Sequence, residues 1–110
     1  MKSKIKIKKL NDEGKINMPV YKGDAGYDVY ATQTIILESL QRFVMPLGIA
    51  LKFPNYLVCQ VNQKSGLATK KGFDTIGNII DSNYRGEIHA IIVNTSSEKL
   101  IIEKGTKIAQ

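Results

Sequence analysis

The sequence predicts an all-β domain with the architecture of a β-sandwich or a jelly-roll barrel. Short apolar or β-branched runs recur along the chain, and Gly, Pro and Asn separate them. No segment shows the 3.6-residue apolar period of a convincing amphipathic helix. A length of 110 residues suits one domain with one modest core. We therefore expect a single β domain over residues 1–110.

The first expected strand, residues 2–9, alternates lysines with Ile5 and Ile7. This two-residue period gives the strand one lysine face. Lysines along an edge strand prevent pairing with neighbouring molecules, and no aromatic side chains interleave with them to stack on nucleic-acid bases. The pattern favours a protected edge strand over a nucleic-acid patch.

The other expected strands follow a polar loop. They are residues 24–31 (a turn that feeds a strand), 34–37, 42–53 (broken by Pro46 and Gly48), 56–61, 77–81, 88–93, 100–103 and 107–110. The basic segment 62–72 is the one place where the sequence allows a short helix. The chain stops inside its last expected strand, which would leave backbone groups unpaired. We therefore expect a domain truncated at its C-terminus.

Composition excludes several classes of protein. Cys59 is the only cysteine, so there is no disulfide framework and no zinc cluster, and a small core residue is expected. No apolar stretch approaches the about 20 residues of a membrane span, and the N-terminus lacks the apolar core of a signal peptide. A soluble, intracellular and hence cytoplasmic protein follows. The net charge of +6 makes a polyanion or a phosphorylated small molecule a candidate partner, as an alternative to a charge that serves solubility alone.

One segment predicts a site at the tip of a β-hairpin. An apolar run carries Asp81 to its end, Ser82 and Asn83 form the turn, and a return strand follows over 88–93. The carboxylate of Asp81 and the ring of Tyr84 thus lie three residues apart on a rigid support. Such a pair can hold a base and a stacking surface at fixed separation.

A second segment offers groups for a phosphate. Lys64 supplies a cation, Ser65 a hydroxyl, and Gly66 lets an anion approach the main chain. Taken alone, a solvated basic turn explains such a segment more often. Similarly, Asp28 beside its turn and the β-turn at 104–107 are usually structural.

These segments together resemble the trimeric dUTPase family (deoxyuridine triphosphate pyrophosphatase) over nearly the whole chain. The matching motifs are Ala-Gly-Tyr-Asp-Val-Tyr-Ala at 25–31, Lys-Ser-Gly-Leu-Ala at 64–68, Ile-Ile-Asp-Ser-Asn-Tyr-Arg-Gly-Glu at 79–87 and Gly-Thr-Lys-Ile-Ala-Gln at 105–110. The third is the most specific. The resemblance implies a jelly-roll domain of the β-clip kind in a homotrimer with shared active sites. It also implies hydrolysis of dUTP to dUMP and pyrophosphate with Mg²⁺, which limits uracil incorporation into DNA and supplies dUMP for dTMP synthesis.

The resemblance also implies roles for single residues. Asp81 would be the general base, and Tyr84 would lie under the deoxyribose and exclude a 2′-hydroxyl. Main-chain groups from Gly77 to Ile80, Asn78 included, would read uracil. The groups that would hold the phosphate chain are Lys64, Ser65, Gly66 and Gln110. Asp28 would organise the metal and its waters, or else stabilise its own turn.

The chain departs from the family pattern at several positions. Lys64 stands where arginine is usual. Lysine keeps the positive charge but cannot make arginine's bidentate hydrogen bonds to phosphate. Asn78 replaces a glycine before the catalytic aspartate. The family's fifth motif, a Gly-rich arm with Arg and Phe that closes over the nucleotide, has no counterpart. We therefore expect weak binding and slow turnover from this chain.

Three other functions stay open on the sequence. A dCTP deaminase shares the architecture, and ammonia release from dCTP would identify it. A non-catalytic relative could act as a binding or regulatory module with a protein partner. A basic β domain that binds nucleic acid would show strongly salt-dependent affinity.

Overall fold

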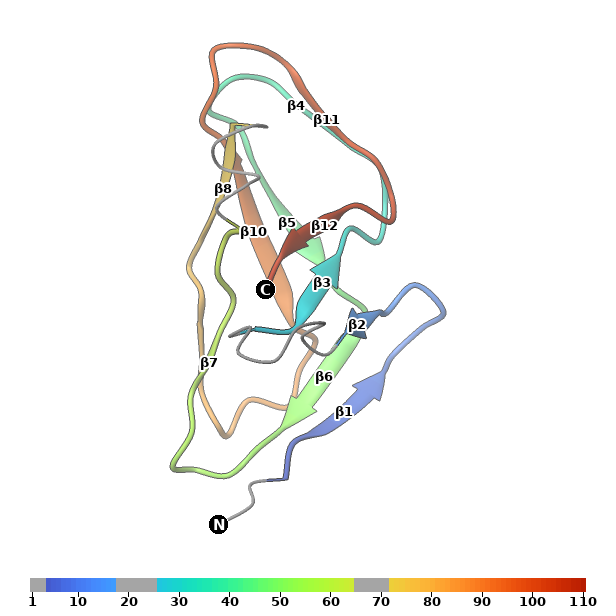
Figure 1. Ribbon diagram of the computed structural model, residues 1–110, viewed down its shortest axis with the longest axis vertical. Coiled ribbons are helices and arrows are strands. Elements are labelled where there is room, and N and C mark those ends of the chain that lie inside the picture. Colours follow the sequence, from blue (N-terminus) through green and yellow to red (C-terminus); the bar gives the residue numbers. More distant parts are fainter. Residues whose placement is uncertain (1–3, 18–25, 65–71) are drawn as a thin grey trace.

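The computed structural model describes residues 4–17, 26–64 and 72–110. Strands and turns make up those ranges, which contain no helix, so the all-β prediction is confirmed there. The strands, all but β9 labelled in Figure 1, are β1 Lys6–Lys9, β2 Ile16–Asn17, β3 Asp28–Tyr30, β4 Ile35–Leu37, β5 Arg42–Pro46, β6 Ile49–Lys52, β7 Cys59–Gln60, β8 Phe73–Ile76, β9 Ile79–Ile80, β10 His89–Asn94, β11 Leu100–Ile102 and β12 Lys107–Ala109. The described residues include no helix able to cross a bilayer.

The strands pair in several small antiparallel sheets (Figure 1). Two sheets have three strands, in the orders β5-β10-β8 and β12-β3-β2. Three further pairs are β1-β6, β11-β4 and β7-β9. Most pairings join distant parts of the chain; Ile36 lies opposite Ile101, and Val29 opposite Ala109. The last two strands, β11 and β12, thereby pair with β4 and β3 from the first half of the chain.

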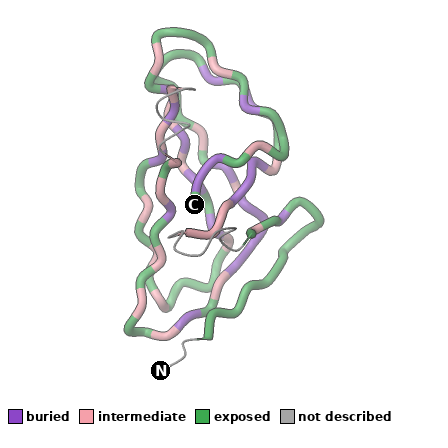
Figure 2. The backbone as a smooth tube through the Cα atoms, viewed as in Figure 1, coloured by how far each residue is buried: buried purple, intermediate pink, exposed green. Residues whose placement is uncertain are grey.

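The core lies between these sheets and follows the two-residue period of the strands. Met45, Leu47, Ile49, Ile92 and Ile108 are fully buried within it. Figure 2 shows buried stretches alternating with exposed ones along the central strands, while β1 is exposed along its whole length. Among the described strands β1 pairs only with β6, which confirms the expected edge strand.

Asn94 is a buried polar residue at the end of β10, with no exposed surface. Its amide nitrogen donates to the carbonyl oxygens of Leu37 at 3.1 Å and Glu98 at 2.7 Å. Its Oδ1 accepts from the backbone nitrogen of Ser96 at 3.0 Å and from the Ser96 hydroxyl at 2.8 Å. One side chain therefore joins the end of β10, the end of β4 and the turn that leads to β11.

The expected break in the 42–53 strand is confirmed, because β5 and β6 are separated at Leu47 and Gly48. Gly48 has φ of +70°, in the region that glycine enters without strain. The chain also passes very close to Gly14 here, where a Cβ would lie 2.1 Å from the Gly48 carbonyl oxygen. The short helix considered within 62–72 falls mostly on residues 65–71, outside the described part of the chain.

The expected hairpin around Asp81 is wrong in its pairing. The turn is present, with the Tyr84 nitrogen donating to the Asp81 carbonyl oxygen at 3.1 Å. However, β9 before it pairs with β7, whereas β10 after it pairs with β5 and β8. The backbone of Ile88 bonds to Ile49 and Leu47 instead of returning beside β9. Burying Ile88 and the inward face of β10 in the core fixes this route.

Cys59, expected in the core, is half-buried on β7 and faces a hollow of about 480 Å³. Apolar side chains from β1, β6 and the β7 region form most of the wall of this hollow, including Ile7, Leu51 and Val58. Burial in these surroundings raises the pKa of the Cys59 thiol above its ordinary value. The thiol therefore stays protonated and weakly reactive at neutral pH.

Candidate functional site

A smaller hollow lies beside the Asp81 turn. Its volume is about 200 Å³, and its wall consists of Gly77, Ile79, Ile80, Asp81, Tyr84, Glu87, Ile88, His89 and Ile91. This is below the roughly 300–1,000 Å³ typical of sites for drug-sized ligands, so the hollow suits a single small ring system. The larger apolar hollow contains none of the carboxylates. The smaller one is therefore the better candidate for chemistry.

Asp81 lies exposed at the rim of this small hollow. Its backbone carbonyl closes the turn, but its carboxylate makes no hydrogen bond or ion pair with a described residue. Strand β9 before Asp81 and the tight turn after it fix the backbone position of this residue, from which the carboxylate extends. A carboxylate in this state can accept a proton from a bound water.

The ring of Tyr84 is held by its own turn. Its hydroxyl donates to the Glu87 carbonyl oxygen at 2.7 Å. A Cβ at Gly86 would lie 2.6 Å from that hydroxyl, so only glycine leaves room for the ring. The Arg85 guanidinium donates to the carbonyl oxygens of Ser82 at 2.6 Å and Tyr84 at 3.2 Å, which fastens the turn from outside. Tyr84 thus offers a fixed flat face on the hollow.

Strand β9 presents an unpaired edge to the hollow. Its register with β7 is Cys59 to Ile80 and Gln60 to Ile79, and the Val61 nitrogen donates to the Asn78 carbonyl oxygen at 2.9 Å. Antiparallel pairs alternate between bonded and non-bonded positions, so the N–H and C=O of Ile79 point away from β7. No other described strand pairs with β9. A donor and an acceptor therefore stand side by side next to Asp81.

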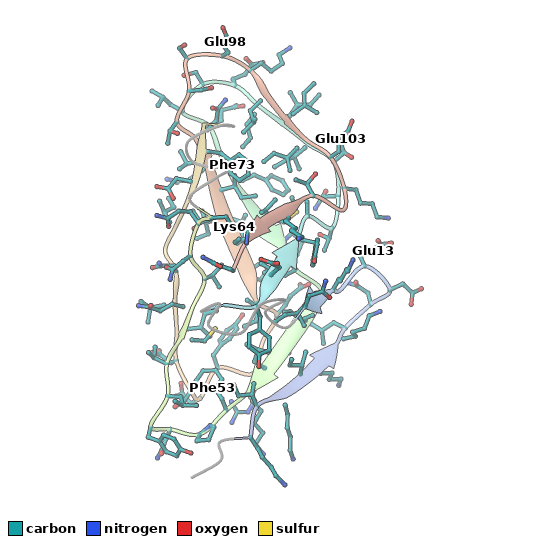
Figure 3. The ribbon with its side chains drawn as sticks, viewed as in Figure 1. Glu13, Phe53, Lys64, Phe73, Glu98 and Glu103 are labelled. Atoms are coloured by element: carbon teal, nitrogen blue, oxygen red, sulfur yellow. The ribbon has the colours of Figure 1, made fainter. Side chains whose placement is uncertain are left out.

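A second group of polar residues lies on the β12-β3-β2 sheet. Asp28 on β3 accepts from the Lys64 ammonium at 2.6 Å through Oδ1, and its Oδ2 lies 3.7 Å from the Lys107 ammonium. Figure 3 labels Lys64 in the region of β12 and β3. Gly26 packs on the Gln110 side chain, and a Cβ there would lie 3.2 Å from it. The first, second and fourth sequence motifs therefore meet here.

Asn62 connects the two groups. Its backbone exchanges hydrogen bonds with Gln110 at 2.8 and 2.9 Å. Its side-chain oxygen accepts from the Asn78 amide at 2.6 Å. Asn78 does not have a positive φ. Asparagine in place of the family's glycine therefore causes no backbone strain here. The Asn78 carbonyl oxygen accepts from Val61, the residue after β7, and the Asn78 side chain donates to Asn62. The backbone groups of Ile79 are therefore the ones that face the hollow.

The structure thus separates the expected site residues into two groups. Gly77, Ile80, Asp81 and Tyr84 border the small hollow, whereas Asp28, Lys64 and Gln110 lie in the second group. Ser65 and Gly66 fall outside the described residues. Sequence reasoning did not assign a role to Lys107 or Glu87. Glu87 borders the hollow and accepts from the Gly48 nitrogen at 2.8 Å. The positions of Lys107 and Glu87 in the site follow from contacts with residues far away in the chain, Asp28 and Gly48, which no sequence pattern predicts.

No cluster of three or more His, Cys, Asp or Glu occurs among the described residues. Asp28 is the one carboxylate in the second group, and both of its oxygens face lysines. This donor set does not form a protein cage for a cation. It fits Mg²⁺ that is carried by phosphates and waters and needs few protein ligands.

Comparison with known proteins gives a consistent result. The model of the family described as dUTPase matches residues 12–110. The curated relatives include a deoxyuridine 5′-triphosphate nucleotidohydrolase of Paramecium bursaria Chlorella virus 1, 37% identical over 98% of this chain and 77% of its own length. Another is the protein of that name from Zymomonas mobilis, 39% identical over 100% of this chain and 78% of its own length.

Solved structures resemble the chain in fold. A mutant dUTPase from phage phi11 of S. aureus, described with a structural Mg(II) ion, superposes with a TM-score of 0.90 at 21% identity over 97% of this chain and 87% of its own. The dUTPase of Staphylococcus bacteriophage 80alpha gives 0.91 at 23% identity over 97% and 86%. At these identities the likeness shows the shared fold, and it confirms the expected fold class.

Proposed function

The chain belongs to the dUTPase family, and on this basis we propose that it hydrolyses dUTP to dUMP and pyrophosphate. The observation that carries the proposal is the small hollow, where an unpaired carboxylate, a fixed aromatic ring and an unpaired strand edge lie together. The reaction would keep uracil out of DNA and supply dUMP for dTMP synthesis. Since its substrate is a free nucleotide, we place the protein in the cytoplasm.

In the proposed reaction Asp81 acts as the general base. It takes a proton from a water molecule, whose oxygen attacks the α-phosphorus in line with the leaving group. The bond between the α-phosphorus and the bridging oxygen to the β-phosphorus breaks, and pyrophosphate leaves with that oxygen. The exposed, unpaired state of the carboxylate supports this role, because no described partner has to be displaced first.

We propose that the edge of β9 reads the base. Uracil carries a donor at N3 next to an acceptor at O4, which matches the C=O and N–H of Ile79 as a neighbouring strand would. Cytosine carries an acceptor at N3 and a donor at N4, so both contacts would become repulsive. Gly77 and Ile80 border the same hollow. A slot of this small volume also supports exclusion of the thymine methyl group.

Hydrolysis rates with four nucleotides, dUTP, UTP, dTTP and dCTP, test the proposed function. We expect pyrophosphate release from dUTP with Mg²⁺ and at least about tenfold lower kcat/KM with UTP, dTTP and dCTP. Release of ammonia from dCTP would instead indicate a deaminase. Release from none of them by the folded protein would contradict the proposal.

Tyr84 should control the choice between deoxyribose and ribose. We expect Tyr84→Ala to raise kcat/KM for UTP relative to dUTP by about tenfold, because the ring no longer fills the space of the 2′-hydroxyl. Steady-state kinetics with both nucleotides measure the ratio. Tyr84→Phe is the matched control; it loses only the hydrogen bond to Glu87 and should keep the selectivity. Unchanged selectivity in Tyr84→Ala would remove this role.

We propose that Lys64, Ser65, Gly66 and Gln110 bind the phosphate chain. Mg²⁺ bound by the phosphates would neutralise their charge, and Asp28 would stand beside this ion and its waters. The charge of Lys64 supports its assignment, and the backbone bonds of Gln110 to Asn62, two residues before Lys64, support that of Gln110. The phi11 dUTPase with its structural Mg(II) ion supports magnesium as the metal.

We further propose a homotrimer whose active sites combine residues from different subunits. In one chain the small hollow beside Asp81 is bordered by none of Asp28, Lys64, Lys107 and Gln110, and only Gln110 of these borders the larger hollow. Next to Asp81, the outer face of the β5-β10-β8 sheet exposes 51% of Val44 and 43% of Ile76 in one cross-strand row. A neighbouring subunit would cover this row and bring its own phosphate-binding residues close to Asp81.

Mixing two inactive variants tests the shared site. Asp81→Asn and Lys64→Ala should each be inactive alone, but unfolding and refolding them together should restore about a quarter of the sites, because some sites then receive both native residues. Pyrophosphate release from dUTP and the mass in solution measure the result. Sites built within one chain would give no recovery, and a monomer would contradict the assembly.

A non-catalytic regulatory function is not favoured, since Asp81 and Tyr84 are both present and border one hollow. Phage dUTPases of similar fold are described as controlling transfer of virulence genes. A protein regulator of this chain therefore stays a prediction, which a pull-down without nucleotide would test.

A further inference from the structure

Asp28 stands between two lysines, of which the proposed function uses only one. Lys64 makes the direct contact at 2.6 Å, while the Lys107 ammonium lies 3.7 Å from the other carboxylate oxygen. The side chain of Asp28 is 14% exposed, against 29% for Lys64 and 53% for Lys107. A carboxylate with so little solvent needs a positive partner at all times.

The strand register accounts for the reach of Lys107. Lys107 on β12 lies opposite Tyr30 on β3. Asp28 and Tyr30 are two residues apart on β3, so their side chains share one face of the sheet. A long side chain on the neighbouring strand reaches such a diagonal position. The more exposed Lys107 is therefore tethered beside Asp28 but not in direct contact.

The difficulty arises when Lys64 binds phosphate. Its ammonium is engaged with Asp28 at direct hydrogen-bond distance, so turning toward a triphosphate weakens or breaks that bond. Without a substitute, the nearly buried carboxylate would keep no protein cation, and its only positive neighbour would be a metal ion that the substrate carries behind its waters, which disfavours the movement. Lys107 is the described cation already placed to close the remaining gap.

We propose that Lys107 is a positioning residue: it becomes the ion-pair partner of Asp28 when Lys64 turns to the phosphate chain. This inference rests on the proposed function, because Lys64 must have a phosphate to bind. Lys107 itself touches no nucleotide in this scheme; it keeps Asp28 compensated. The affinity for the triphosphate therefore includes the cost of exchanging one lysine for another on Asp28.

Kinetics of Lys107→Met test the exchange. We expect KM for dUTP to rise about fivefold while kcat stays within about twofold, because the loss affects phosphate binding and not the proton transfer at Asp81. Lys107→Arg keeps a cation of similar reach and should restore KM. Affinity for dUMP, which lacks the terminal phosphates, should stay the same in all three proteins.

Lys15→Met is the matched control for loss of charge. Lys15 lies 4.4 Å from the centre of the Tyr30 ring, on the same sheet face as Lys107, but it has no contact with Asp28. Removing it subtracts the same charge from the local field. If the two Met variants raise KM equally, a general field explains the effect and the inference is overturned.

The Asp28→Asn background supplies the decisive comparison. A neutral amide needs no counter-charge, so Lys107→Met should change KM less than about twofold there. Persistence of the full loss in that background would overturn the inference.

Binding of inorganic tripolyphosphate, measured by calorimetry, separates this inference from the proposed function. Loss of tripolyphosphate affinity in Lys107→Met but not in Lys15→Met supports the exchange even if dUTP is not hydrolysed. Equal affinities in the native protein and both Met variants would overturn it.

Discussion

Asp81→Asn should lower kcat for dUTP hydrolysis by about 10²- to 10⁴-fold and leave the affinity for a non-hydrolysable dUTP analogue nearly unchanged. The amide has the shape of the carboxylate but cannot take a proton from the attacking water. Since Asp81 is exposed and its carboxylate has no partner among the described residues, the substitution removes no contact that holds the fold. Pyrophosphate release and calorimetric binding measure the two quantities.

Asp12→Asn provides the matched control for this substitution, since Asp12 is an exposed loop residue outside both polar groups. Its kcat should equal that of the native chain. A loss of less than about tenfold in Asp81→Asn would show that another group accepts the proton.

Asn94→Ala should lower the free energy of unfolding by about 3 kcal/mol, because it removes the hydrogen bonds that this fully buried side chain makes with Leu37, Ser96 and Glu98. For a domain of this size the melting temperature should fall by more than about 10 °C. Thermal and urea unfolding, followed by circular dichroism, measure the change.

The control for Asn94 is Asn55→Ala in an exposed turn, which should change the free energy of unfolding by less than about 0.5 kcal/mol. Equal melting temperatures for the two variants would mean that the hydrogen bonds of Asn94 contribute nothing net.

The sequence was sufficient to predict elements whose causes are local. Pro46 and Gly48 mark the end of β5, and Ser82 and Asn83 form the turn after Asp81, because backbone freedom and turn chemistry act within a few residues. The same local reasoning placed the lysine-rich strand β1 at an edge. The motif at the third segment likewise predicted that Asp81 and Tyr84 border one site.

Partnership between distant segments could not be predicted in this way. The pairing of β9 with β7 depends on how Ile88 and β10 fill the core, and no local pattern encodes that outcome. The contact between Lys64 and Asp28 spans 36 residues. Asn94 looks like part of a turn in the sequence, and only the surrounding carbonyl groups make it a buried anchor.

The pairing of distant strands also determines how the chain reaches its native state. Ile36 must find Ile101, and Lys6 must find Lys52, before either pair contributes any stability. Each such closure costs chain entropy in advance, so the nucleus for folding is expensive and the rate is low. Proteins dominated by such pairings fold in milliseconds to seconds, and their unpaired strands stay open to association meanwhile. The lysines of β1, which repel a second copy at that edge, protect the chain during this slow search as well as afterwards.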